Sequence, residues 1–463
     1  MNIMNKYRDK KILIVGFGIT GVAVAKYMTK KGAKVTVTDT RKESELHESI
    51  SACADLKLHY ELGKPSNKPF PSADLIVMSP GVPLTIKALD EARLLNTPIT
   101  SEIELAAAEI REPIIGVTGT NGKTTTTSLI GEMFRADGKT VFIGGNIGKP
   151  LLDYVTEELK TDIIVAELSS FQLELLESLR PVAAVFTNLE EDHMDRYTDI
   201  HAYSQMKRRL LKSCTAGSFI VLNYDSLNIS KFKDENPGNL LWFMKGDPMK
   251  VGGAFAEHFS GAYLNILTKK ITVRINGKED VFDLAQYRLF GEHNKENLMG
   301  AICVARALGV EPAAIQSVIN IFKGVNHRLE FIRKKDGVFF FNDSKGTNVM
   351  SVQRSLSSFN ANPIILIAGG KDKNSDFTPL VDLVKRKCKI LILLGEAKEK
   401  INRAIGDYAE TYLVGTFEEA ILLSYQKSRS GDIILLSPGC ASFDMFRNYE
   451  ERGDYFKKLV AQL

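Results

Sequence analysis

Short runs rich in valine and isoleucine recur along almost the whole chain, each separated from the next by a segment with helical spacing of its apolar residues. Within the runs, apolar and polar residues hardly alternate, which is typical of strands buried on both faces of a parallel sheet. The clearest runs are Ile12–Val15, Val35–Thr38, Leu75–Met78, Ile114–Val117, Ile163–Ala166, Val182–Thr187, Ile364–Ala368, Ile390–Leu394 and Ile433–Ser437. Strands that alternate with helices predict the α/β fold class, with mostly parallel sheets between layers of helices.

The chain has 463 residues, too many for one ordinary hydrophobic core. We predict three domains, over residues 1–101, 102–325 and 326–463. Asn96-Thr97-Pro98 interrupts a helix near the first boundary, and Gly324-Val325-Asn326 marks the second. Each of the three domains is predicted to be an α/β unit. Residues 251–283 have the pattern of short strands and turns, which predicts a small antiparallel addition to the central domain.

A glycine-rich turn with one lysine, Gly119-Thr120-Asn121-Gly122-Lys123-Thr124, follows the run Ile114–Val117 and precedes an amphipathic helical pattern. Backbone N–H groups in such a turn point at a bound polyphosphate, and the helix N-terminus adds its positive dipole end. The lysine neutralises the outer phosphates, and the next threonine can hold Mg²⁺. The standard phosphate loop has a glycine where this chain has Val117, so an ordinary tight turn is the alternative. The agreement of strand, turn and helix favours ATP binding.

A second glycine-rich turn, Gly16-Phe17-Gly18-Ile19-Thr20-Gly21, follows the first predicted strand, and Asp39 closes the second. The spacing fits a dinucleotide fingerprint, although the glycines indicate only close backbone approach to a phosphate. Three interpretations stay open: helix–strand packing without a ligand, a nicotinamide-dependent oxidoreductase, and a site for another nucleotide diphosphate. We favour the third, with Asp39-Thr40-Arg41 at the base or ribose.

Polar residues follow several predicted strands, at the edge where α/β proteins bind their ligands. Glu167 ends a strand and is suited to hold Mg²⁺. His193 lies in an acidic loop, which favours a ligand or catalytic role over a structural one. Asn294 and Asn297 lie three residues apart at a helix start and share a face. An asparagine amide can pair with adenine, while N-capping by Asn294 is the alternative.

The overall composition excludes several classes of function. A net charge of +4 is too small to indicate nucleic acid or a membrane surface as a partner. No apolar stretch approaches the roughly 18 residues needed to span a bilayer, and Met1–Lys11 lacks the apolar core of a signal peptide. Five scattered cysteines without CxxC spacing argue against a disulfide framework or a structural zinc site. We therefore expect a cytoplasmic protein.

Taken together, these motifs make the chain resemble the Mur ligases, the ATP-dependent amide-forming enzymes of peptidoglycan assembly. The resemblance extends from Gly16 to Tyr455, and Val117 also fits the ATP loop of that family. Its decisive segments are Gly119–Thr125, Glu167, Asn188–Asp195, His293–Asn297 and His327-Arg328. The branch that adds D-glutamate is the most similar in four further segments: Asp192–Tyr197, Asp343–Asn348, Gly369–Lys373 and Ser437–Asp444.

The resemblance implies that the chain adds D-glutamate to UDP-N-acetylmuramoyl-L-alanine through an acyl-phosphate intermediate. It also implies Rossmann-like first and third domains on either side of a central P-loop-type ATPase domain, ATP and two Mg²⁺ ions in the reaction, small-molecule partners and a monomer. Because three ligands on three domains can meet only when the third domain swings in, we predict a hinge near Gly324–His327. A related ligase that uses another amino acid or folate is the first alternative. An oxidoreductase built on Gly16–Gly21 and an inactive nucleotide-binding protein are the others.

The resemblance also implies a role for each matching residue. The residues for ATP are Gly119, Thr120, Asn121, Gly122, Lys123, Thr124, Thr125, Asn294, Asn297, Arg328 and Asp343. Those for the uridine nucleotide substrate are Gly18, Ile19, Thr20, Asp39, Thr40, Arg41, Ser79, Gly81, Asn146, Ser169 and Gln172. Those for D-glutamate are His327, Thr347, Lys373, Ser442 and Tyr449. Those for the metal are Thr124, Glu167, His193 and Lys207.

Four of these residues, Lys123, Glu167, His193 and Lys207, are implied to be catalytic. Lys207 aligns with a carbamylated lysine of the family, and its alternative is the first charge of a solvated basic helix face. The chain departs from the family pattern at Tyr449 and Gly346, where phenylalanine and alanine are common, and Lys371 is a second lysine beside Lys373. These departures concern the amino-acid pocket and leave the phosphate chemistry unaffected.

Overall fold

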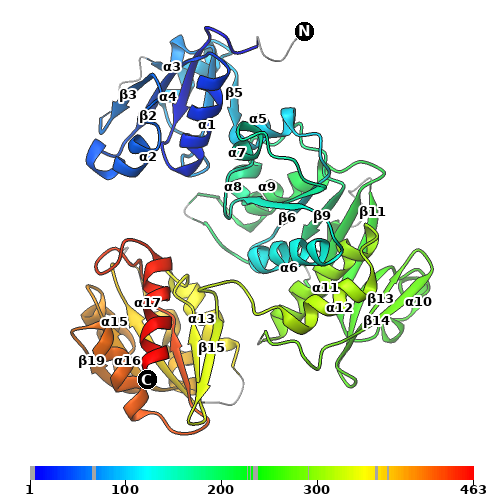
Figure 1. The fold of residues 1–463 in the computed structure, drawn as a ribbon, viewed down its shortest axis with the longest axis vertical. Helices are drawn as coiled ribbons and strands as arrows, with labels where there is room; N and C mark the ends of the chain where they lie inside the picture. The colour runs from blue at the N-terminus through cyan, green and yellow to red at the C-terminus, as the bar shows by residue number, and fades with distance from the viewer. Residues whose placement is uncertain are drawn as a thin grey trace. The chain divides into compact units, whose positions relative to one another are not determined.

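The computed structural model describes residues 6–64, 69–194, 196–226, 228–229, 231–232, 238–289, 291–359, 363–372 and 375–463. These residues form three sheets with flanking helices (Figure 1). In each sheet most neighbouring strands are parallel, which confirms the predicted fold class.

The N-terminal sheet has the order β3-β2-β1-β4-β5, and all its pairs are parallel. Its strands are β1 (Lys11–Val15), β2 (Lys34–Asp39), β3 (Leu58–Leu62), β4 (Leu75–Met78) and β5 (Ile99–Ser101). Its helices are α1 (Ile19–Lys30), α2 (His47–Ser51), α3 (Pro69–Ser72) and α4 (Ala88–Leu94), and α5 (Glu102–Glu109) leads into the next sheet.

The central sheet has nine strands in the order β14-β13-β12-β11-β10-β9-β6-β8-β7. The strands are β6 (Ile114–Thr118), β7 (Val141–Gly145), β8 (Ile163–Glu167), β9 (Ala183–Phe186), β10 (Phe219–Asn223), β11 (Asn239–Lys245), β12 (Gly261–Asn265), β13 (Lys270–Ile275) and β14 (Lys278–Asp283). The helices are α6 (Lys123–Ala136), α7 (Leu151–Thr156), α8 (Ser170–Leu173), α9 (Ile200–Lys212), α10 (Gly253–Glu257), α11 (Glu292–Ala307) and α12 (Pro312–Ile321). The predicted antiparallel addition is confirmed for β12 to β14, whereas residues 253–257, expected to be strand or turn, form α10.

The C-terminal sheet has the order β15-β16-β20-β17-β18-β19, and only the β15–β16 pair is antiparallel among the described residues. Its strands are β15 (Glu330–Lys335), β16 (Val338–Asn342), β17 (Ile364–Gly369), β18 (Cys388–Leu394), β19 (Glu410–Leu413) and β20 (Ile433–Leu436). Its helices are α13 (Val349–Ser357), α14 (Val381–Lys387), α15 (Lys398–Ile405), α16 (Phe417–Lys427) and α17 (Tyr449–Gln462).

The chain divides into two compact units, one of Met1–Gln286 with Glu296–Asn320 and one of Tyr287–Lys295 with Ile321–Leu463. The first unit contains both the N-terminal and the central sheet. Their flanking helices are joined by hydrogen bonds: Tyr27 and Lys31 of the α1 region both donate to Glu109 of α5, at 2.7 and 3.1 Å. The domain boundaries at residues 101 and 325 stay predictions.

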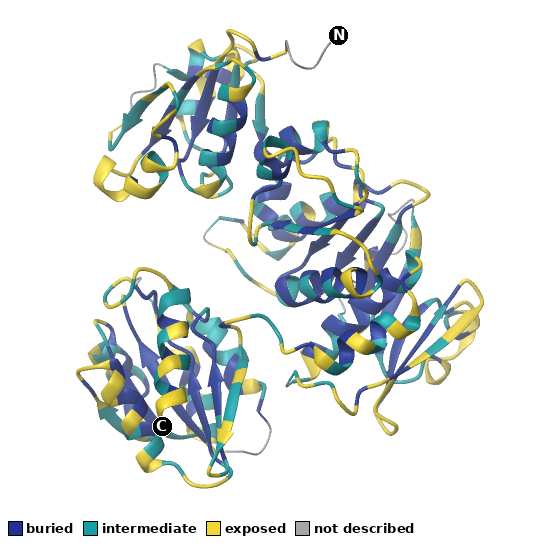
Figure 2. Cartoon of the chain, viewed as in Figure 1, coloured by how far each residue is buried: buried dark blue, intermediate teal, exposed yellow. Residues whose placement is uncertain are grey.

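The inner strands of all three sheets are buried, whereas the edge strands β3, β14, β15 and β19 and the outer faces of the helices are partly exposed (Figure 2). In the first unit one continuous apolar cluster extends from β1 and α1 through α5 and α7 to β8 and β9. Strands held between helices on both sides place their carboxyl ends, and the loops that follow, at the surface, where ligands can reach them.

Candidate functional site

The predicted phosphate loop is a tight turn between the buried strand β6 and the helix α6. Gly122, with a φ of 77°, is the residue before α6. Gly119 has a φ of 141°, and a Cβ there would lie 2.0 Å from the hydroxyl oxygen of Thr187. A Cβ on Gly122 would lie 2.0 Å from Oδ1 of Asn297. Both glycines are therefore required by close approach of neighbouring segments as well as by backbone conformation.

The loop after β9 holds the phosphate loop in place. The amide of Asn121 donates to Oδ1 of Asn188 at 2.8 Å, and the amide of Thr120 donates to the carbonyl of Asn188 at 2.9 Å. The hydroxyl of Thr187 donates to the carbonyl of Asn121 at 2.5 Å. These bonds fix the loop at the N-terminus of α6, where the first backbone amides of a helix favour an anion.

Two lysine amino groups converge on one carbonyl of this loop. Nζ of Lys123 donates to the carbonyls of Gly119 and Thr120 at 3.0 and 2.8 Å, and Nζ of Lys207 on α9 donates to the same Gly119 carbonyl at 2.7 Å. Lys207 is 1% exposed, whereas its neighbours Arg208 and Arg209 are partly exposed, so it is not part of a solvated basic face. Burial, followed by the charge of Lys123, holds the pKa of Lys207 well below its ordinary value.

Glu167 ends β8 beside the phosphate loop, in register with Val117 of β6. It is 2% exposed, and its Oε1 accepts a hydrogen bond of 2.8 Å from the side-chain amide of Asn146. Its Oε2 is buried without a hydrogen-bond partner among the residues that the structure describes. A buried carboxylate oxygen of this kind is costly unless a cation or donor completes its environment.

His193 lies in the loop after β9 with a φ of 60°, a conformation uncommon for residues other than glycine. Its side chain is 43% exposed, and its ring packs on that of Phe171 with centroids 4.6 Å apart. Backbone strain of this kind clusters at ligand and switch sites, which agrees with a functional role for His193.

A cavity of about 610 Å³ opens beside the N-terminal glycine-rich turn, in the first compact unit. All eleven residues predicted for the uridine nucleotide line it: Gly18, Ile19, Thr20, Asp39, Thr40, Arg41, Ser79, Gly81, Asn146, Ser169 and Gln172. Several residues that were not predicted for this role also line it, among them Pro80, Val82 and Phe171. Asn146 links the two features, because it lines the cavity and also donates to Glu167.

Asp39 organises one wall of this cavity. Its carboxylate accepts hydrogen bonds from the amide of Phe17 at 2.8 Å and from the guanidinium of Arg41 at 2.7 and 3.1 Å. Burial raises the pKa of Asp39, but the hydrogen bonds from Arg41 and from the two backbone amides outweigh it and leave the pKa below its ordinary value. The carboxylate of Asp39 therefore stays ionised and holds the half-exposed side chain of Arg41 at the cavity.

In the second compact unit, predicted site residues lie at the carboxyl ends of the adjacent strands β16 and β20. Asp343 follows β16 and is buried, with its Oδ2 accepting from the hydroxyls of Ser355 and Ser437 at 2.6 and 2.7 Å. Burial raises the pKa of Asp343, opposed by these two hydrogen bonds. Ser442 is buried in the loop after β20, and Thr347 is half-buried in the loop after β16.

His327 and Tyr449 pack edge to face, with centroids 6.2 Å apart. His327 is 5% exposed, and its Nδ1 lies 3.1 Å from the side-chain amide of Asn342. Burial and the charge of Lys457 lower the pKa of His327. Gly453 allows this packing, because a Cβ there would lie 2.1 Å from Nδ1 of the histidine.

Arg452 of α17 ties the same loops together, although no sequence motif indicated it. Its guanidinium donates to the carbonyls of Ser344 at 2.9 Å, Cys440 at 3.2 Å and Ala441 at 3.3 Å, and its side chain is fully buried. Burial lowers the pKa of Arg452 to about 10. The loops after β16 and β20 are thus held by one cation.

Three family models match successive parts of the chain. Residues 10–101 match the Mur ligase MurD-like, N-terminal domain, residues 117–305 the Mur ligase middle domain, and residues 327–440 the Mur ligase, glutamate ligase domain. The UDP-N-acetylmuramoylalanine–D-glutamate ligase of Bdellovibrio bacteriovorus is 45% identical over 461 residues, which are 98% of this chain and 97% of that one. The ligase of the same name from Geotalea uraniireducens is 43% identical over 455 residues, 98% of each chain.

The chain belongs to the Mur ligase family. Solved structures show the same fold at low identity. A pseudomurein peptide ligase type C from Methanothermus fervidus has a TM-score of 0.58 at 20% identity, covering 98% of this chain and 100% of that one. The MurF ligase of Thermotoga maritima in complex with ADP has a TM-score of 0.58 at 16% identity, covering both chains fully. Membership places the chain among the ATP-dependent amide ligases.

The structure brings the predicted residues of this Mur ligase together in two groups. The first unit contains the phosphate loop, Glu167, His193, Lys207, Asn297 and the cavity residues, and the second contains Asn294, Arg328, Asp343 and most of the residues predicted for D-glutamate. Lys373, predicted to contact D-glutamate, lies outside the described residues. Phe171 could have been found from its place between Ser169 and Gln172, whereas no local pattern marks Arg452.

Proposed function

We propose that this chain joins D-glutamate to UDP-N-acetylmuramoyl-L-alanine, with ATP converted to ADP and phosphate. The 45% identity to a ligase of that name, over 98% of the chain, supports these substrates. The observation that carries the proposal is the convergence of Lys123 and Lys207 on the phosphate loop, beside buried Glu167 and the cavity that Asn146 shares with it. This set of groups suits a polyphosphate and a carboxylate that must be brought together.

A carboxylate does not react with an amine at neutral pH, because both groups are ionised and oxide is a poor leaving group. In the proposed reaction, the alanine carboxylate of the nucleotide attacks the γ-phosphorus of ATP, forming an acyl phosphate and releasing ADP. The neutral amine of D-glutamate then attacks the acyl carbon, and the tetrahedral intermediate expels phosphate and loses a proton. Transfer of a phosphoryl group depends mostly on positioning and charge neutralisation, so the site needs no nucleophilic side chain.

The phosphate loop supplies both requirements in this proposal. Its backbone amides and Lys123 bind the β- and γ-phosphates, and the loop after β9 keeps them rigid through Asn188 and Thr187. Asn146 and the capping box formed by Ser169 and Gln172 line the cavity and orient the alanine end of the nucleotide. The turn at Gly18 and the Asp39–Arg41 pair hold the uridine diphosphate.

The residues at this site fit Mg²⁺, which prefers oxygen ligands and usually binds one or two carboxylates together with substrate phosphates. Oε2 of Glu167 is a buried oxygen that lacks a protein partner among the described residues, and Thr124 stands in the first turn of α6. Among these residues no group of three or more His, Cys, Asp or Glu side chains could hold a metal alone. We propose that Glu167 and Thr124 hold one ion and that His193 and Lys207 position a second. When bound, the ions offset the repulsion between carboxylate and γ-phosphate.

We propose that Lys207 carries a carbamate, formed when its neutral amine adds CO₂ and a proton is released. Burial and the nearby Lys123 favour the neutral amine that this addition requires. The carbamate would reverse the charge of the side chain and remove the repulsion between the two lysines.

The amino-acid site is proposed at the loops after β16 and β20, with Thr347, Ser442 and Tyr449 as contacts. His327 is proposed to position Tyr449, since it is buried against that ring. Three earlier expectations stay predictions. They are the contact of His327 itself with D-glutamate, the hinge near Gly324–His327, and the adenine and phosphate roles of Asn294, Asn297, Arg328 and Asp343.

We also propose a cytoplasmic monomer. All five cysteines are free, which agrees with a reducing compartment. No helix among the described residues is long and apolar enough to cross a lipid bilayer.

Phosphate release from ATP tests the proposal. The purified protein is incubated with ATP, Mg²⁺ and UDP-N-acetylmuramoyl-L-alanine, and D-glutamate, L-glutamate, L-alanine or meso-diaminopimelate is added in separate reactions. Release with D-glutamate alone is expected. Release only with another amino acid would mean that this amino acid, and not D-glutamate, accepts the acyl group. NADH binding without any ATP turnover would favour an oxidoreductase.

A further inference from the structure

Arg196 lies next to the cavity and contacts the N-terminal domain through its guanidinium. Nη1 donates to the carbonyl of Pro80 at 2.9 Å, and Nη2 donates to the carbonyl of Val82 at 3.2 Å. Pro80 and Val82 belong to the loop after β4, which lines the cavity that contains the predicted uridine-nucleotide residues. Arg196 itself follows β9, in the central sheet, so one side chain fixes a cavity wall that another domain supplies.

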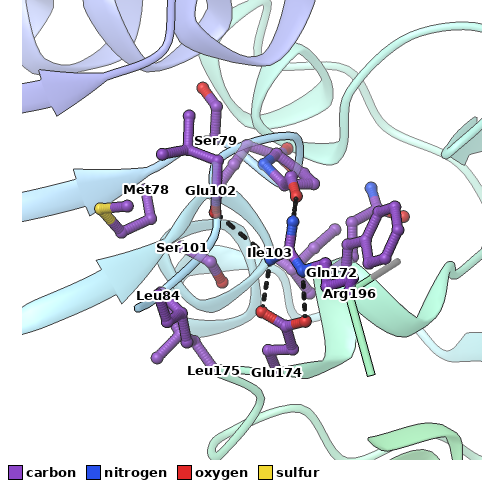
Figure 3. Close-up of a pocket in the computed structure, with 13 residues that line it drawn as sticks. Met78, Ser79, Leu84, Ser101, Glu102, Ile103, Gln172, Glu174, Leu175 and Arg196 are labelled. Carbon is purple, nitrogen blue, oxygen red and sulfur yellow. Dashed lines mark hydrogen bonds and ion pairs between the residues drawn. The ribbon is translucent and has the colours of Figure 1, made fainter. Parts of the chain in front are cut away.

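The largely buried carboxylate of Glu174 holds this guanidinium from the opposite side. Nε and Nη2 of Arg196 donate to the two oxygens of Glu174 at 2.9 and 2.6 Å, and Figure 3 shows the two side chains facing each other. Their side chains are only 11% and 9% exposed. Such a bidentate arginine–carboxylate pair fixes direction as well as charge, which lysine cannot do equally well.

The same guanidinium connects to the predicted catalytic residues through aromatic rings. It lies 4.3 Å from the ring centre of Phe171, and the ring of Phe171 packs in turn on those of His193 at 4.6 Å and Tyr197 at 6.0 Å. On the carboxylate side, the hydroxyl of Tyr197 donates to Glu174 at 2.8 Å, and the ring of Tyr197 packs on that of Tyr203 at 5.4 Å. Nζ of Lys207 lies 4.6 Å from the ring centre of Tyr203.

We propose that Arg196 is a positioning residue that sets the loop Ser79–Val82 relative to His193 and Lys207. The inference rests on the proposed function: the nucleotide end of the substrate lies in the cavity, and its reacting carboxylate must reach the γ-phosphate. A small displacement of one end misaligns the other, and misplacement by about 1 Å can cost about 100-fold in rate. Arg196 touches no reacting atom in this account and acts through the loop and Phe171.

The test uses variants of the full chain and two measurements. Arg196→Lys keeps a charge opposite Glu174 but loses the fork that reaches both carbonyls. Glu174→Gln/Arg196→Gln removes both buried charges, so that neither is left unpaired. Arg180→Gln is the matched control, because Arg180 is an exposed arginine that donates only to the nearby carbonyls of Glu177 and Leu179 among the described residues. For each variant, kcat is measured by phosphate release and the Kd for UDP by calorimetry.

We expect both Arg196 variants to fold with melting temperatures near that of the wild type and to bind UDP within about threefold of its affinity. Their kcat should fall by about 10- to 100-fold, while Arg180→Gln keeps the wild-type kcat. A purely structural role would lower the melting temperature and leave kcat per folded molecule unchanged.

A kcat within twofold of the wild type in both folded Arg196 variants would overturn the inference and leave the proposed function intact. No turnover by the wild-type protein, with D-glutamate and the nucleotide supplied, would overturn the proposed function, and this inference with it.

Discussion

Replacing the buried Glu102 by glutamine should change how stability depends on pH. Glu102 is the first residue of α5 and is 1% exposed, and its Oε1 accepts a hydrogen bond of 2.6 Å from the amide of Leu152. Burial raises the pKa of Glu102 from 4.5 to about 7; the Leu152 amide opposes this and the charge of Asp153 adds to it. Between pH 4.5 and about 7, the folded protein therefore keeps a proton on Glu102 that the unfolded chain has already released.

The sign and size of the effect follow from proton linkage. Between pH 4.5 and about 7 the unfolded state binds fewer protons at this position, so the free energy of unfolding falls as the pH rises. Each unit by which the folded pKa exceeds the unfolded pKa lowers the free energy of unfolding by about 1.4 kcal/mol, so the total loss is about 3 kcal/mol and is complete above pH 7. Glu102→Gln keeps an oxygen for the Leu152 amide but has no titrating group, so it should not show this loss.

Urea unfolding at pH 5 and pH 8, followed by the fluorescence of the single tryptophan, Trp242 of β11, measures the difference. Trp242 lies in the same compact unit as Glu102. From pH 5 to pH 8, Glu102→Gln should gain about 2.5 kcal/mol relative to the wild type, because a small part of the loss has already occurred at pH 5. The exposed Glu48, changed to glutamine, is the control and should follow the wild-type profile. Parallel profiles for wild type and Glu102→Gln would refute the reasoning.

Three further outcomes follow from the phosphate loop. Lys123→Ala should lower turnover by about 100-fold or more, because a charged contact to the transferring phosphate is lost, and phosphate release near the wild-type rate would remove Lys123 from the mechanism. Gly119→Ala should lower the melting temperature and abolish ATP binding in calorimetry, because the new Cβ would lie 2.0 Å from the Thr187 hydroxyl oxygen. In the control Gly217→Ala the new Cβ meets nothing within 4 Å, so neither property should change. Equal behaviour of the two variants would contradict the steric argument. Lys207→Arg keeps a positive charge but cannot carry a carbamate, so kcat should fall by about tenfold or more; an unchanged kcat would exclude the carbamate.

Much of the fold could be predicted because parallel strands buried on both faces leave a simple sequence pattern. The runs Ile114–Val117 and Ile163–Ala166 correspond to β6 and β8, which differ from the prediction by one terminal residue each. Residues 253–257 were harder, because the five-residue helix α10 is too short to show a helical period.

That the eleven residues predicted for the uridine nucleotide would lie together could be foreseen, because the walls of their cavity are loops at strand ends, where residue type reflects ligand chemistry. Glu102 and Arg196 could not be singled out in the same way. Their roles depend on partners far away in the sequence, Leu152 for Glu102 and Pro80 and Val82 for Arg196. A charged residue beside a predicted helix or loop is usually solvated, so sequence alone gives no reason to expect burial.

In the proposed reaction this Mur ligase activates a carboxylate by transferring the γ-phosphate of ATP to it. The most direct measurement uses UDP-N-acetylmuramoyl-L-alanine labelled with ¹⁸O in its carboxylate, turned over with ATP and D-glutamate, followed by mass spectrometry of the released phosphate. We expect one ¹⁸O atom in each inorganic phosphate, because the carboxylate oxygen leaves with the phosphoryl group. Phosphate without label, or label in AMP, would contradict it.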